Sequence, residues 1–184
     1  MNSTMTPQHL LSSAPDAGTR KEALADLVDV RTIRMEFSLA ADTRRIFEAL
    51  TVPEYMELWM SIPGCHSGCH SRASRLSGGF VFDHLCDRRP LSVRGMYTVC
   101  LRRKIVFTWA LSGLRGASTS CADIRLSGDF ERSVLRLRHS GFASDDDCSW
   151  HVALWTASLS RLSRLLGGAG SETTASEPRR RQRP

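Results

Sequence analysis

The 184-residue sequence predicts an α+β fold with one early strand, two short helices, about six further strands and one long C-terminal helix. Two observations predict the sheet. Seven strand-length segments occur, most with apolar and polar residues alternating, and short connections join the later ones, which favours an antiparallel meander. A third observation predicts the helix, because near the C-terminus apolar residues instead recur every three or four positions.

The first three elements are expected close together. Residues 32–39 alternate between apolar and polar side chains, as a half-buried strand does. Asp42 suits the N-cap of a short helix over residues 43–50, because its carboxylate can accept hydrogen bonds from the first turn. Pro53 then interrupts that helix, and residues 54–60 provide one or two further helical turns.

Six further strands follow, separated by turn signals. Gly78 and Gly79 suit a tight turn, and Arg102, Arg103 and Lys104 look like a connection between two strands. The six strands are expected over residues 71–76, 80–84, 92–99, 104–111, 118–126 and 133–140.

The last element is a helix of about 20 residues, over residues 147–166. Three carboxylates, Asp145 to Asp147, lie where its first turn begins, and negative charge there is favoured by the helix dipole. At 1.5 Å per residue the helix is about 30 Å long, enough to cross a whole sheet. Its apolar face consists of Val152, Trp155, Leu159, Leu162 and Leu166.

Length and charge indicate one folded domain with two tails. We expect the domain over residues 31–166, a flexible segment over 1–30 and a disordered basic tail over 167–184. Lys and Arg number 25 against 19 Asp and Glu, a formal charge of +6. The first segment holds four acids and two bases, and the tail four arginines and two glutamates, so the domain itself is basic.

Several classes of protein are excluded by what the sequence lacks. No segment approaches the ~18 consecutive apolar residues that cross a bilayer, and no secretion signal opens the chain, so we expect a cytoplasmic protein without a membrane partner. The six cysteines are then expected to be free thiols. No nucleic-acid partner is expected either, because the terminal arginines have no interleaved aromatic residues and no recognition helix beside them.

Five sequence phrases, in this order, resemble the SRPBCC superfamily. Within it, the likeness is strongest to domains related to the activator of the heat-shock protein 90 ATPase, and it covers residues 31–166. The phrases are IFEALT with Pro53 (46–53), GGFVF (78–82), KIVFTW (104–109), LRLRHSGF (135–142) and HVALW (151–155).

The resemblance implies a helix-grip fold. In this fold a curved antiparallel sheet of about six to seven strands wraps the long C-terminal helix and leaves a cavity between them. This chain departs from the family in having Leu154 where a glycine usually precedes the helix tryptophan, and Leu154 would fill space that glycine leaves open. The loop after Trp59, rich in Cys and His, is also atypical. Either departure could reshape the cavity entrance.

The alternation identifies side chains that should point toward the helix and line such a cavity. Mostly apolar walls with a few polar groups suit a small hydrophobic ligand, since each polar group left unpaired by a wrong ligand costs binding energy. The alternative is that the aromatic residues are plain core and the histidines bond to backbone or water. The candidate ligand-binding residues are Trp59, Phe82, His84, Phe107, Trp109, His139 and Trp155.

No catalytic residue or cofactor is expected. Asp83 should face away from His84 on the same strand, so these neighbours do not form an acid–base pair. The chain also lacks the Gly-x-Ser-x-Gly turn of serine hydrolases and the glycine-rich loops that bind phosphates.

A run of thiols and imidazoles in one loop is the sharpest local cluster. Cys65, His66, Cys69 and His70 offer four zinc ligands, but adjacent Cys and His side chains point apart, so no metal site is expected. Redox sensing or a disulfide between the two cysteines are the alternatives for this loop.

Three functions remain open. The first is a small-ligand binder in which His139 orients the ligand between sheet and helix. The second is a protein-interaction module, like the heat-shock protein 90 activators, that presents Arg102, Arg103 and Arg138 to an acidic partner such as a chaperone. The third and less favoured is a polyketide-cyclase-like enzyme, which requires His84 and His139 to approach a common wet point. A closed core around Leu154 would argue against the first and the third.

Overall fold

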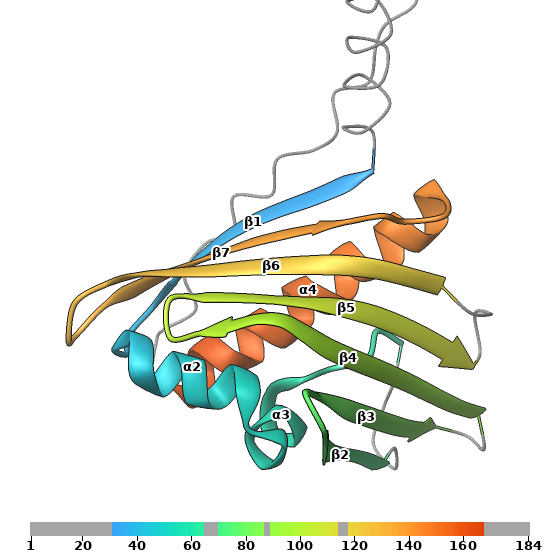
Figure 1. Ribbon diagram of the computed structural model, residues 1–184, viewed down its shortest axis with the longest axis horizontal. Coiled ribbons are helices and arrows are strands. Elements are labelled where there is room, and N and C mark those ends of the chain that lie inside the picture. The colour runs from blue at the N-terminus through green and yellow to red at the C-terminus, as the bar shows by residue number, and fades with distance from the viewer. Residues whose placement is uncertain (1–30, 65–69, 87–88, 114–117, 168–184) are drawn as a thin grey trace, which may run out of the picture. The chain divides into compact units, whose positions relative to one another are not determined.

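The computed structural model describes residues 31–64, 70–86, 89–113 and 118–167 (Figure 1). The segment expected over 1–30 and the tail after Gly167 lie outside the described residues, as do Cys65, His66 and Cys69.

Seven antiparallel strands form one sheet in the described part of the chain. Across the sheet their order is β1-β7-β6-β5-β4-β3-β2, so β2 to β7 follow a meander and the first strand pairs with the last. That pair aligns Thr32 with Ser140 and Leu39 with Ser133. The strands β1 to β7 span Thr32–Leu39, His70–Leu76, Gly79–Cys86, Arg89–Leu101, Lys104–Gly113, Ser118–Gly128 and Ser133–Ser140.

Among the residues that the structure describes, three helices accompany the sheet: α2 (Thr43–Thr51), α3 (Pro53–Trp59) and α4 (Asp145–Leu165). Asp42 caps α2 by accepting from the backbone N–H groups of Arg44 and Arg45. The side chain of Ser144 caps α4, with three aspartates in the first turn and Arg164 in the last, so both ends complement the helix dipole.

The long helix α4 lies across one face of the sheet, and the core fills the space between them (Figure 1). Alternation along each strand decides which side chains enter this core; β5, for example, buries Ile105, Phe107 and Trp109 while the residues between them are only half-buried. Gly95 in β4 has a packing role, because a Cβ at this position would overlap the ring of Phe80 on β3.

The elements confirm the fold class predicted from the sequence. Strands β1 and β7 have the predicted bounds, and the other strands extend one to three residues beyond theirs where hairpin pairing continues. The predicted helix face needs adjustment, because Val152 is only half-buried whereas His151, Leu154 and Ser158 are buried. Helix α4 therefore presents a more polar face to the sheet than its leucines suggested.

Candidate functional site

All seven candidate ligand-binding residues are buried. Phe82, Trp109 and His139 have no exposed area and Trp155 retains 1 %, while Trp59 retains 2 %, Phe107 5 % and His84 7 %. A side chain that lined a water-sized void would keep accessible area. At Phe82, Trp109 and His139 the space between sheet and helix is therefore filled by neighbouring side chains.

The seven residues form one close group and two outlying positions. Trp109, His139 and Trp155 meet between the sheet and α4, with ring centroids 5.2 to 5.9 Å apart. Phe107 adjoins this group, 6.2 Å from the Trp109 ring.

The outlying residues have local partners of their own. Trp59, in α3, donates its indole N–H to the carbonyl of Ala49 at 2.7 Å, which joins α3 to α2. His84, on β3, stacks on Phe82 at 6.4 Å and shares a 2.7 Å hydrogen bond with Ser71 on β2. Burial lowers the pKa of His84 below its ordinary value. As predicted, Asp83 faces the other way and accepts from the hydroxyl of Ser92.

The hydrogen bonds of His139 define its tautomer. The indole N–H of Trp155 donates to His139 Nδ1 at 2.8 Å, so this nitrogen is unprotonated. The proton of the neutral ring is then on Nε2, which donates to Ser120 Oγ at 2.7 Å. The hydroxyl in turn has the carbonyl of Trp109 within reach at 3.4 Å. Trp155, His139, Ser120 and Trp109 thus form one directed chain of donors and acceptors.

Electrostatics also keep the His139 ring neutral. Burial, and to a smaller degree the neighbouring His151, hold the pKa of His139 well below its ordinary value. The ring of His151 lies 5.2 Å away, and its Nδ1 contacts Asp147 at the backbone oxygen (2.8 Å) and at Oδ1 (3.1 Å).

Ser120 and His139 lie within hydrogen-bond reach, but their donor and acceptor roles are the reverse of those that nucleophilic catalysis needs. A catalytic base must present a lone pair to the hydroxyl and donate its other N–H to an acceptor. Here the lone pair is on Nδ1, directed at an indole donor, and Nε2 faces the hydroxyl as a donor. His84 lies on β3, at Ser71 and Phe82, and not in this group, so the two histidines do not share the common point that the polyketide-cyclase-like hypothesis requires.

Two members of this group were not singled out by sequence reasoning. Ser120 shares its face of β6 with buried Ala122, Ile124 and Leu126, so the alternation of the strand was a usable signal. His151 precedes Trp155 by one helical turn and shares its buried face, so the helical repeat of apolar positions was a usable signal for it.

Leu154 occupies the position before Trp155 where the family usually has glycine. Its side chain has no exposed area and belongs to the core cluster. Ligand binding between sheet and helix therefore stays a prediction, and it requires α4 or its side chains to move.

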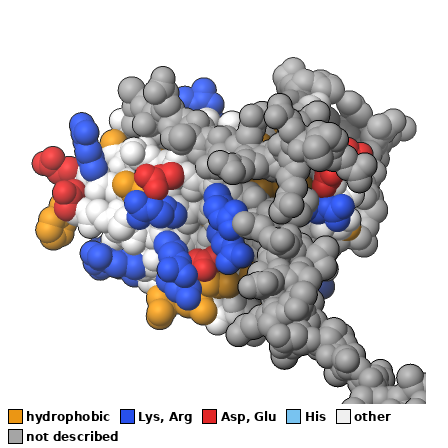
Figure 2. All heavy atoms as spheres, turned by 90° about the horizontal axis from the view of Figure 1, so that it is seen from above, with side chains coloured by type: hydrophobic (Ala, Val, Ile, Leu, Met, Phe, Trp, Pro, Cys, Tyr) orange, Lys and Arg blue, Asp and Glu red, His pale blue; other side chains and the backbone are white. Residues whose placement is uncertain are grey.

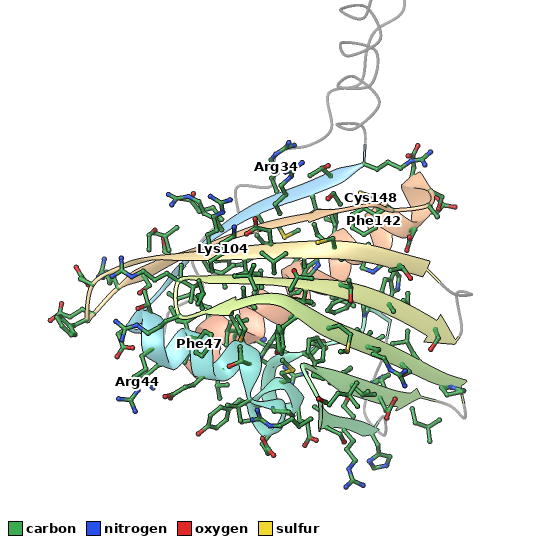
Figure 3. All side chains as sticks on the ribbon, viewed as in Figure 1. Arg34, Arg44, Phe47, Lys104, Phe142 and Cys148 are labelled. Atoms are coloured by element: carbon green, nitrogen blue, oxygen red, sulfur yellow. The ribbon has the colours of Figure 1, made fainter. Side chains whose placement is uncertain are left out.

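The side of the sheet away from α4 is charged. Seven residues there form what we call the outer basic face, and Figure 2, which views the molecule from the β1 side, shows basic side chains predominating with a few acidic ones among them. Arg34 points away from the sheet on this side (Figure 3). Six of the seven residues line a hollow of about 490 Å³. The outer basic face consists of Arg34, Glu36, Lys104, Asp123, Arg125, Arg136 and Arg138.

Strand register arranges these charges in two rows. One row crosses Arg34, Arg138 and Asp123, and the other crosses Glu36, Arg136, Arg125 and Lys104. Arg136 bonds Glu36 at 2.7 Å, and Arg125 lies 3.4 Å from Asp123. Five bases against two acids leave the face net positive.

The three arginines proposed for an interaction surface are not all together. Arg138 lies on the outer basic face, whereas Arg102 and Arg103 form the predicted turn between β4 and β5 and line a separate hollow.

The thiol and imidazole loop is largely outside the described residues. Of its four candidate ligands only His70 is described, exposed at the start of β2. Among the residues that the structure describes, no group of three or more His, Cys, Asp or Glu side chains is placed to hold a metal ion. No helix in the described part of the chain is long and apolar enough to span a membrane.

A seven-stranded antiparallel sheet closed by a C-terminal helix defines the class as a helix-grip domain. The family model for "Activator of Hsp90 ATPase homolog 1-like protein" matches residues 40–167, more than half of the chain. The protein therefore belongs to this family, as its sequence phrases predicted. A search of curated proteins finds no match.

Solved structures share the fold at low sequence identity. Protein CV1439 from Chromobacterium violaceum is 19% identical with a TM-score of 0.61, over 74% of this chain and 97% of that one. The AHSA1 protein SPO3351 from Silicibacter pomeroyi is 19% identical with a TM-score of 0.59, over 73% and 96%. DynU16, from the dynemicin biosynthetic locus, is 20% identical with a TM-score of 0.55, over 74% and 47%.

Proposed function

We propose that this domain is a protein-interaction module that binds an acidic partner through its outer basic face, in the manner its family description suggests for Hsp90. The observation that carries the proposal is the pair of charged rows across β1, β7, β6 and β5. Strand register puts Arg34 directly opposite Arg138. The five bases of the outer basic face outnumber its two acids, and charge complementarity across an interface favours an acidic partner.

The interior between the sheet and α4 is filled by side chains, and this supports the same proposal. Candidate lining residues have little or no exposed area, and the Ser120 and His139 pair is held in a non-catalytic tautomer by Trp155. A small-ligand binder or an enzyme would have to open this core first, whereas a surface module uses the fold as described.

Charge complementarity at an exposed face mainly raises the rate at which two proteins associate, and salt screens this effect. The Debye length is about 10 Å at 0.1 M salt and about 3 Å at 1 M, so binding should weaken steeply over this range.

The test is titration of the full chain with purified Hsp90, following complex formation and ATPase rate at low and high salt. Arg138→Glu should weaken binding about tenfold, a change of about 1.4 kcal/mol. Arg138 makes no ion pair with another described residue, so the variant breaks none.

The matched control is Arg72→Glu, because Arg72 is also an exposed arginine and lies on the far edge strand β2. Its binding should change less than about twofold. The proposal fails if no complex or ATPase stimulation occurs at any salt concentration, or if the two variants weaken binding equally.

A further inference from the structure

Strand β1 forms one edge of the sheet (Figure 1). Within the described part of the chain it pairs with β7 on one side and with no strand on the other. Alternate residues of an edge strand direct their backbone N–H and C=O groups away from the sheet, so such an edge is a template for a further strand. The outer edge of β1 is therefore a candidate interaction surface.

The opposite edge of the sheet, β2, is covered by a helix. Helix α3 packs against β2, and Glu57 of α3 accepts from the backbone N–H of Ala73 at 2.6 Å. The carboxylate thereby uses a backbone donor that a further strand would need. The two edges of the sheet thus differ in how the described residues treat them.

Strand β1 has none of the features that keep edge strands from pairing. Proteins protect such strands with proline, β-bulges, lysine or inward-pointing charges. The strand TIRMEFSL contains no proline or lysine, and its register with β7 is unbroken from Thr32 to Leu39. Its inward side chains are all apolar. Nothing in the strand itself therefore opposes the addition of another strand.

The edge is also held in place before any partner arrives. Arg31 donates from Nε to Asp145 Oδ1 and from Nη1 to the carbonyl of Ala143, both at 2.8 Å, which fixes the start of β1 to the start of α4. Farther along, Ile33 and Phe37 are buried in the core. A strand that is already ordered loses little backbone entropy when it pairs.

The charges on the exposed side of β1 are complementary to a second copy of the same strand. Arg34 and Glu36 lie on either side of Met35. In an antiparallel pair of identical strands, residues at equal distances from the centre lie opposite each other. A pair centred on Met35 therefore sets Arg34 of each copy opposite Glu36 of the other. Moving the centre to Arg34 or to Glu36 would set like charges opposite each other, which is unfavourable.

We propose that the protein forms a symmetric dimer in which the β1 strands of two copies pair antiparallel about Met35 and join the two sheets into one. Thr32 of each copy then lies opposite Ser38 of the other. Glu36 binds Arg136 of its own chain through Oε2, and its second oxygen can accept from Arg34 of the other copy. Residues opposite each other point to the same face, so the apolar side chains of both strands stay on the side of α4.

This dimer goes beyond the proposed function and does not depend on it. It places the outer basic faces of the two copies side by side on one continuous sheet, where a partner with two acidic segments could bind both. Pairing of one short strand from each copy is a small interface, so we expect a dissociation constant of about 1–100 µM.

The test is sedimentation velocity of the full chain without Hsp90, from about 1 to 300 µM. We expect a shift from monomer to dimer in this range, and slower hydrogen exchange of the β1 amides in the dimer. Arg34→Glu or Glu36→Arg alone sets like charges opposite each other at both symmetric positions, and each should weaken the dimer about tenfold or more. The two variants are complementary to each other, so an equimolar mixture should form a heterodimer.

Arg72→Glu, on the covered edge β2, is the matched control and should change the dissociation constant less than about twofold. The proposal is overturned if the full chain stays monomeric up to about 300 µM. It is also overturned if either charge-reversal variant dimerises as Arg72→Glu does, or if their mixture forms no heterodimer. Arg138→Glu separates the two proposals, because it should weaken Hsp90 binding and leave the dimer intact.

Discussion

At the scale of single residues, His139 is the group whose chemistry the fold determines most fully. It accepts from Trp155, donates to Ser120 and is completely buried. A protonated ring would place an N–H against the indole N–H and would lose its water without gaining an anion. The neutral state of His139 is therefore part of what holds α4 on the sheet.

Stability should fall as pH falls below about 6.5, the ordinary histidine value. His139 and His84 both have a lowered pKa in the folded chain, so below that pH the unfolded chain binds more protons and the free energy of unfolding decreases. Each histidine contributes at most about 1.4 kcal/mol per pH unit. Urea unfolding at several pH values measures the slope.

His139→Gln provides the control for this dependence, because an amide can accept from Trp155 and does not titrate in this range. The variant should be less stable at neutral pH and have a flatter profile below it. An unchanged slope would assign the dependence to His84 or to other groups.

The tautomer of His139 is directly measurable. Nitrogen chemical shifts of the labelled ring should show Nε2 protonated and Nδ1 bare in the full chain. Trp155→Phe removes the donor and should let the Nδ1–H form appear, at a cost of about 1–3 kcal/mol for the lost hydrogen bond. A ring with Nδ1 protonated in the unmodified protein would contradict the directed chain and reopen the enzyme hypothesis.

At the scale of elements, α4 is fastened to the rest of the domain by both packing and hydrogen bonds. Ser158 accepts from the N–H of Ser61 at 2.9 Å and donates to its carbonyl at 3.2 Å. Leu154 fills the space beside Trp155, where the family resemblance implies a smaller residue. The helix is thus packed against the sheet at the position where a ligand cavity was expected.

Leu154→Ala should lower the free energy of unfolding by about 2–5 kcal/mol, because it removes apolar contacts and leaves a cavity. The matched control is Leu165→Ala at the exposed end of the same helix, where Leu165 is 46 % exposed and the loss should stay below about 1 kcal/mol. Chemical denaturation measures both. Similar losses for the two variants would show that Leu154 is not tightly packed.

Most elements were predictable because their signals are local. Alternation identified most of the strands, Asp42 marked the start of the helix α2, and the position of Asp83 next to His84 on one strand predicted that it faces the other way. The tautomer of His139 was not predictable, because it depends on Trp155 from α4 and Ser120 from β6. The sequence also could not show that Arg138 lies in a different hollow from Arg102 and Arg103. That placement follows from the pairing of the first strand with the last, which sets Arg138 beside the residues of β1.

At the scale of the whole molecule, the described residues combine a filled interior with charged surface hollows, one on the outer basic face and one at the β4–β5 turn. The interior residues that could orient a ligand instead bond to one another, while arginines line both hollows. Our central claim is that this domain acts through its surface and that its helix-grip core is closed.

The most direct test is native mass spectrometry and thermal shift of the full chain against a panel of lipids and small aromatic compounds. The account predicts no bound molecule and no shift in Tm for the unmodified protein, whereas Leu154→Ala gains a shift with small apolar compounds that fill its cavity. An apolar compound that stabilises the unmodified protein as much as the variant would contradict the claim and restore the ligand-binding function.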